Sequence, residues 1–235
     1  MPIKTVEENL SVNMEKQSSS NLHIRKQQWL RTRNEKLAGI LSGEESVKID
    51  DFTIEIEGPE YGWLDITFTT EGQKPFSINA SDVYPPFPNL RAWLEDLVHF
   101  TTIPSKSFVM DCENYKVLLS YDYLGVIEKD DILEPVALIL LEDDIPEEEQ
   151  KDDFGYSLML IVPVRSFVSK LYYTLKNYMF TNRRVFSKNW NHPNGGDFDI
   201  RKLMRSFVSK NIEEVIKKMD EHTQDLGHWP LIRIK

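Results

Sequence analysis

The stretch that decides the fold runs from Phe52 to Ala80 and reads FTIEIEGPEYGWLDITFTTEGQKPFSINA. Apolar and polar residues alternate within it in three runs, residues 52–57, 64–69 and 76–80. An alternation of period two is typical of β-strands that turn one face toward solvent. Gly58-Pro59 and Glu71-Gly72-Gln73 lie between the runs and are expected to form the turns. Three strands joined this closely predict an antiparallel meander.

Four runs further along the chain also have strand character, residues 108–112, 115–121, 136–141 and 157–162. The last two are largely apolar, which favours central strands that are buried on both faces. A proline-rich segment, residues 84–88, separates the first meander from these runs. Pro88 is well placed to open a helix, because its missing N–H costs nothing in the first helical turn.

Apolar residues recur at helical spacing in three other segments, residues 23–41, 167–178 and 200–219. A short last strand is expected at residues 231–235. Together these patterns predict an α+β fold. It consists of a mainly antiparallel sheet of about six or seven strands, with helices packed largely on one face. The hexapeptide RSFVSK occurs twice, at residues 165–170 and 205–210, but its flanks differ and favour coincidence over duplication.

Length and composition favour one folded domain. The chain has 235 residues, of which 40% are hydrophobic and 28% charged, as in globular proteins. Residues 1–21 are polar and are expected to form a mobile tail, and residues 22–235 a single domain. The sequence shows no export signal and no apolar run long enough to span a bilayer, so a cytoplasmic location is expected.

The charge is unevenly distributed along the chain. Residues 51–160 hold 24 acidic and 6 basic side chains, whereas residues 161–235 hold 14 basic and 7 acidic ones. The densest feature is a run of eight carboxylates within twelve residues: Glu142, Asp143, Asp144, Glu147, Glu148, Glu149, Asp152 and Asp153. Mutual repulsion should keep this segment extended and hydrated. It is also a candidate docking surface for a basic protein, since acidic surface steers such a partner.

The sequence gives little support for catalysis. It contains no phosphate-binding glycine loop, no nucleophile elbow and no zinc-binding helix motif. Cys112, the single cysteine, is expected to be a buried structural thiol. His192, Asp197 and Asp199 form the best candidate for a hydrolytic or metal-dependent site, although turns often have this composition. No cofactor or metal is expected.

A second alternative is nucleic-acid binding by the basic C-terminal helices. Arg183, Arg184, Lys188 and Arg201 alternate there with the aromatic residues Tyr178, Phe186 and Trp190. The acidic middle of the chain would repel nucleic acid unless it faces away. The favoured hypothesis is therefore a non-catalytic cytoplasmic protein-binding module, for example an immunity-type inhibitor or an adaptor for a basic partner.

Overall fold

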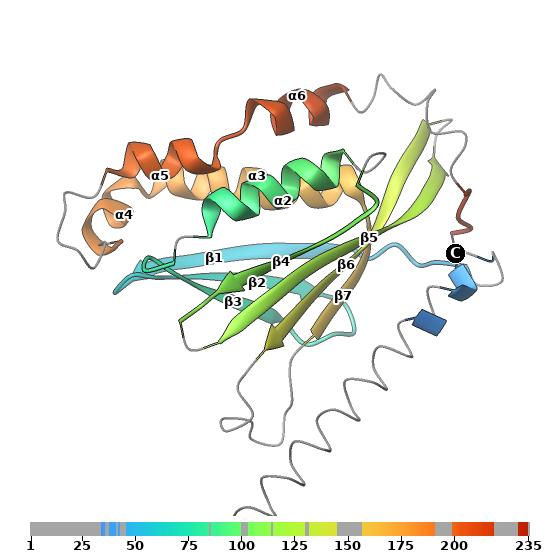
Figure 1. Ribbon diagram of the computed structural model, residues 1–235, viewed down its shortest axis with the longest axis horizontal. Coiled ribbons are helices and arrows are strands. Elements are labelled where there is room, and N and C mark those ends of the chain that lie inside the picture. The colour runs from blue at the N-terminus through green and yellow to red at the C-terminus, as the bar shows by residue number, and fades with distance from the viewer. Residues whose placement is uncertain are drawn as a thin grey trace, which may run out of the picture.

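The computed structural model describes residues 34–35, 38–40, 42, 46–84, 86–99, 103–113, 115–129, 132–144, 157–190, 199–218 and 230–234. Within this part, seven strands form two antiparallel sheets, so the α+β class with antiparallel pairing is confirmed (Figure 1). The expected single sheet is divided into one sheet of three strands and one of four. The expected tail, residues 1–21, lies outside the described residues, as does most of the expected helix at 23–41.

The first sheet is the predicted meander, in the order β1 (Phe52–Glu60), β2 (Trp63–Thr70) and β3 (Phe76–Ser81). Its inner face carries the apolar partners of each strand, for example Ile66 opposite Ile78. The prediction of the first turn was wrong. Gly58 and Pro59 lie inside β1, and the chain reverses at Tyr61 and Gly62. Both turn residues have positive φ, 49° and 87°, as in the two-residue hairpin turn that matches strand twist.

The second sheet has the order β4 (Ser105–Asp111), β5 (Lys116–Lys129), β6 (Ile132–Asp144) and β7 (Ser157–Pro163). The apolar run in β6 is central, as predicted, but β7 lies at the sheet edge. Its outer backbone groups are nevertheless paired. Asp50 exchanges two hydrogen bonds with Ile161, at 2.8 and 2.7 Å, and the Gln73 side chain does the same with Met159. The strand has an apolar sequence because Leu158 and Leu160 pack on one face of the sheet and Ile161 packs on the other.

Five helices are described: α2 (Phe87–Val98), α3 (Val164–Thr181), α4 (Arg183–Asn189), α5 (Ile200–Phe207) and α6 (Lys210–Lys218). Helix α2 has a proline in its first turn, as predicted. The single helix expected at 200–219 is interrupted at Val208 and Ser209, where Val208 adopts extended backbone. None of the described helices is long and apolar enough to cross a membrane.

Two hydrophobic clusters hold these elements together. The larger cluster joins the inner faces of both sheets to α2, α3, α5 and α6, with Trp93 and Phe167 in edge-to-face contact at 6.1 Å. The smaller cluster lies on the other face of the second sheet and includes Leu138, Val47 and Ile232. The expected last strand is reduced to isolated parallel bridges, Val126 to Leu231 and Val47 to Ile234.

Candidate functional site

The acidic segment begins at the end of β6. Glu142 is half-buried and pairs with Ser157 across the strands, and the backbone of Asp144 pairs with Lys116. Asp143 continues the series of alternate β6 residues whose side chains face the core, and it is also half-buried. Its Oδ1 atom is buried without a hydrogen-bond partner in the described part of the chain, and burial raises the pKa of its carboxyl to about 6. Glu147, Glu148, Glu149, Asp152 and Asp153 lie outside the described residues.

The candidate hydrolytic trio is described only at Asp199. This residue caps the N-terminus of α5, where its carboxylate accepts a hydrogen bond from the Arg201 amide at 2.9 Å. His192 and Asp197 lie outside the described residues, so the trio stays a prediction. Among the residues that the structure describes, no three His, Cys, Asp or Glu side chains are grouped to hold a metal ion.

The basic helices expose their cations but not the aromatic residues expected to stack on bases. Phe186 and Trp190 are buried, and their ring centroids lie 5.6 Å apart. The Tyr178 hydroxyl donates a hydrogen bond to the Gly58 carbonyl. Phe186 and Trp190 therefore belong to the core, and Tyr178 is half-buried and packs against it. The four predicted basic residues are exposed, and Arg183 stacks over the Phe180 ring at 4.6 Å.

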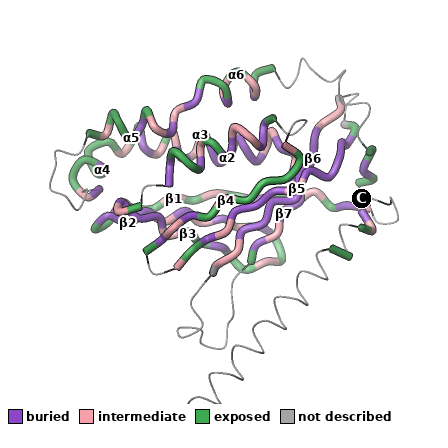
Figure 2. The backbone as a smooth tube through the Cα atoms, in the orientation of Figure 1, coloured by how far each residue is buried: buried purple, intermediate pink, exposed green. Residues whose placement is uncertain are grey.

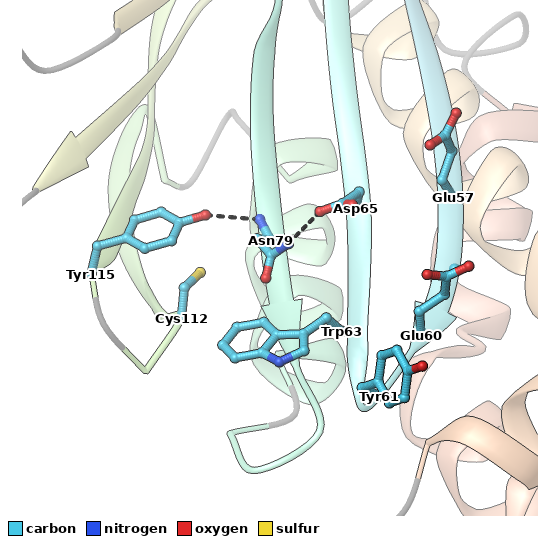
Figure 3. Close-up of a pocket in the computed structure, with 9 residues that line it drawn as sticks. Glu57, Glu60, Tyr61, Trp63, Asp65, Asn79, Cys112 and Tyr115 are labelled. Carbon is cyan, nitrogen blue, oxygen red and sulfur yellow. Dashed lines mark hydrogen bonds between the residues drawn. The ribbon is translucent and has the colours of Figure 1, made fainter. Parts of the chain in front are cut away.

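A pocket that sequence reasoning missed lies on the outer face of the first sheet, where β3 meets the turn between β4 and β5 (Figure 3). Its volume is about 630 Å³. Nine residues line it: Glu57, Gly58, Glu60, Tyr61, Trp63, Asp65, Asn79, Cys112 and Tyr115. We call it the acidic pocket, because three of these residues are carboxylates and none is Lys or Arg.

An irregularity in β1 brings Glu57 and Glu60 to the same side. Side chains three residues apart on a regular strand point to opposite faces. The β1–β2 register shifts between Glu57 and Glu60, so that Glu57 lies opposite Asp65 and Glu60 opposite Trp63. A bulge of this kind turns the side chains of Glu57 and Glu60 to the same face of the sheet, and both carboxylates line the pocket. Neither carboxylate forms an ion pair or hydrogen bond with any other described residue.

Glycine is required at position 58 in this bulge. The residue has φ +97°, and an added Cβ would lie 2.7 Å from the Trp63 carbonyl oxygen. Any side chain here would displace β2 from β1. The local sequence therefore builds the wall of the pocket that carries Glu57, Glu60 and Trp63.

The opposite wall comes from the turn between β4 and β5. Figure 3 shows Tyr115 and Cys112 approaching from one side and Glu57 and Glu60 from the other, with Trp63, Asp65 and Asn79 between them. The backbone N–H of Asn79 donates a hydrogen bond to the Tyr115 hydroxyl at 2.9 Å, and the side-chain amide of Asn79 donates one to the Asp65 carboxylate. The first hydrogen bond ties the first sheet to the turn of the second sheet, and the second lies within the first sheet, between β3 and β2.

The thiol of the pocket is not poised for nucleophilic attack. Cys112 is buried, and desolvation raises the pKa of its thiol to about 12, so the thiolate is scarce at neutral pH. Burial likewise raises the pKa of the Tyr115 hydroxyl. The remaining lining groups are carboxylates, an amide and aromatic rings, which suit a positively charged ligand.

The pocket was missed because its residues are far apart in the sequence. The alternation of residues 52–57 and 64–69 predicts a solvent face that carries Thr53, Glu55, Glu57 and Asp65. The structure shows the first three exposed and Asp65 half-buried on that face. Cys112 and Tyr115 approach this face only after the second hairpin folds. The one local signal was the segment Glu60-Tyr61-Gly62-Trp63, which places two aromatic residues and an acid around a turn glycine.

Comparisons with family models, with curated proteins and with solved structures gave no match.

Proposed function

We propose that this protein is a non-catalytic, cytoplasmic protein-binding module whose acidic sheet face receives a basic partner protein. The observation that carries the proposal is the charge of the first sheet. Strands β1, β2 and β3 contain four acidic side chains and no basic one. We call these four residues, Glu55, Glu57, Glu60 and Asp65, the acidic face.

The acidic face is open to solvent. Glu55, Glu57 and Glu60 are exposed, and Asp65 is half-buried. Unpaired surface carboxylates speed encounter with a basic protein by roughly 10- to 1,000-fold at low ionic strength. An immunity-type inhibitor or an adaptor would use such a surface, and the acidic segment from Glu142 to Asp153 would add further negative charge to the protein.

Charge reversal tests this proposal. The full chain, immobilised, is exposed to a lysate of its host, and the variant Glu55→Lys/Glu57→Lys is compared with the control Glu128→Lys/Glu214→Lys. The control changes the net charge equally at two exposed residues on β5 and α6. We expect a basic protein to be retained by the wild type and the control and lost from the first variant.

The complex should weaken by about tenfold or more between 50 and 300 mM salt, because the interaction is between exposed charges. Reversal of Glu147, Glu148 and Glu149 to Lys should weaken it further if the acidic segment contributes. Equal retention by both double variants, or a captured partner without excess positive charge, contradicts the proposal.

A second candidate function, polyanion binding, is favoured by the opposite charge of the helices. Helices α3 to α6 contain twelve basic and two acidic side chains. The basic residues of α4, α5 and α6 are all exposed, and Figure 2 shows exposed residues along the same three helices. A labelled single-stranded oligonucleotide at 50 mM salt tests this function. The variant Arg201→Glu/Lys202→Glu/Arg205→Glu should abolish binding, and a flat wild-type titration excludes it.

A further inference from the structure

We infer that the acidic pocket is a receptor for one arginine side chain of a partner protein, with the guanidinium stacked on aromatic rings and paired with carboxylates. This inference rests on the proposed function, because it names the group through which a basic partner would be recognised. The first support is the cavity itself. Its volume of about 630 Å³ falls within the range of roughly 300–1,000 Å³ that is common for ligand sites.

The aromatic residues of the pocket are the second support. Trp63 and Tyr115 are half-buried, so one part of each ring packs on protein and another part faces the cavity. Tyr61 stands at the rim with 96% of its surface exposed. The face of a Trp or Tyr ring attracts a cation through the ring's quadrupole, and arginine stacks on such rings more readily than lysine.

The carboxylates supply the third support. Glu57 and Glu60 have no partner among the described residues, whereas the Asp65 carboxylate already accepts a hydrogen bond from Asn79. Two free carboxylates on one wall match the forked donors of a guanidinium, which bind carboxylate oxygens in pairs.

A further negative charge lies close to the opposite wall. Asp143 acts electrostatically on both Cys112 and Tyr115, and its Oδ1 atom is buried without a hydrogen-bond partner in the described part of the chain. The pocket therefore carries two unpaired carboxylates on one wall, and Asp143 adds negative charge near the residues of the other.

The test uses full-length, isotope-labelled protein and short peptides. The probe is acetyl-Gly-Gly-Arg-Gly-Gly-amide, and the matched control peptide contains citrulline, which has nearly the same shape but no charge. We expect the arginine peptide to shift the Trp63 indole resonance and the amide resonances of the pocket, with a Kd of about 1 mM or tighter. The citrulline peptide should bind at least about tenfold more weakly, and a lysine peptide should fall between the two.

Variants of the chain separate the pocket from Glu55, the one residue of the acidic face that does not line it. Tyr61→Ser, at an exposed position that leaves the core intact, should weaken the arginine peptide about threefold, and Glu57→Gln/Glu60→Gln about tenfold. Trp63→Leu should weaken it by a similar factor. Glu55→Gln, on the same face but outside the pocket, should change the affinity by less than twofold.

The results distinguish failure of the inference from failure of the proposed function. Equal shifts with arginine and citrulline, shifts outside the pocket, tighter binding of lysine, or no shift at 10 mM peptide overturn the arginine receptor. If the charge-reversal capture still succeeds in that case, the protein-binding function stands on the charge of the acidic face, without a specific arginine site. Selective binding of the arginine peptide without any captured basic protein supports the receptor and removes the proposed function.

Discussion

At the scale of single residues, Tyr61 holds a backbone conformation that few aromatic residues adopt. Its φ of 49° lies in the left-handed region, which costs a residue with a Cβ about 1 kcal/mol. Glycine and asparagine are the usual residues of this turn. The protein therefore displays the ring at the rim of the acidic pocket at a cost in stability.

Tyr61→Asn should raise the free energy of unfolding by about 0.5–1 kcal/mol, because asparagine tolerates positive φ. Urea denaturation followed by circular dichroism measures the change. Tyr84→Asn is the control, since Tyr84 is also exposed but does not have positive φ. An unchanged or lower midpoint for Tyr61→Asn would show that the ring itself stabilises the turn.

Asp143 is a second residue that lowers the stability of the folded protein. Burial raises the pKa of its carboxyl from 3.8 to about 6 in the folded protein. Between these values the folded state binds more protons than the unfolded state, so this group makes stability fall as pH rises. Above about pH 6 the carboxylate is ionised in both states and its cost is complete.

Asp143→Asn should remove this cost. The variant is expected to match the wild type at pH 4 and to exceed it by about 1 kcal/mol at pH 7.5, a figure reduced for the half-exposed position. Denaturant midpoints of both proteins at four pH values test the prediction. A difference that stays constant with pH would show that Asp143 has the same pKa in both states.

At the scale of elements, the side chain of Tyr172 in α3 organises the start of α6. Its hydroxyl donates to the Glu213 carboxylate at 2.7 Å and accepts from the Ser209 amide at 2.9 Å. The Ser209 hydroxyl in turn accepts from the Ile212 amide at 3.2 Å, as an N-cap does. The break between α5 and α6 is thus fixed by a contact with α3.

Tyr172→Phe should lower the free energy of unfolding by about 1–2 kcal/mol, because it leaves the buried Ser209 amide without a partner. Thermal and urea unfolding measure the loss. Tyr173→Phe, at the neighbouring position, should cost less than about 0.5 kcal/mol, because the Tyr173 hydroxyl has no hydrogen bond with described residues. Equal effects of the two substitutions would contradict this role of Tyr172.

At the scale of the whole molecule, Gly125 allows the C-terminal segment to pack closely against the second sheet. Residues 230–232 lie along β5, where the Val126 amide donates to the Pro230 carbonyl at 3.0 Å and the Ile232 amide donates to the Val126 carbonyl at 2.8 Å. Gly125 has φ +148°, and an added Cβ would lie 2.3 Å from the Pro230 carbonyl oxygen. Only glycine allows this approach of two backbones.

Gly125→Ala should therefore destabilise the protein by about 2–3 kcal/mol and expose the C-terminal segment to proteolysis. Gly72→Ala is the matched control. It also has positive φ, 78°, but an added Cβ meets nothing within 4 Å, so backbone strain alone should cost about 1 kcal/mol. Unfolding midpoints and limited digestion report the two effects. Similar losses of stability in both variants would show that the chain can move apart at Gly125 and Pro230 without a cost in free energy.

Charge is also separated at this scale. The strands of the first sheet are acidic and the last four helices are basic, although the net charge of −10 conceals this division. The sequence already showed the division by position along the chain. The structure assigns the two charges to different elements, each with exposed charged residues.

The sequence by itself determined where most strands and helices form and which of their faces are buried. Strand alternation placed Glu57 and Asp65 on the solvent face, and helical spacing placed Phe167 and Leu171 in the core, because each pattern depends only on neighbouring residues. It also anticipated that Cys112 is buried.

Only the tertiary structure decided the features that depend on distant partners. RSFVSK is continuous helix at 165–170 but contains the α5–α6 break at 205–210, because Tyr172 pairs with the Ser209 amide of the second copy. The edge position of β7, closed by Asp50 and Gln73, has the same origin. The acidic pocket exists because a bulge in β1 and a hairpin about fifty residues later meet at β3. No local pattern encodes such a meeting, since its free energy comes from contacts made after the chain has folded.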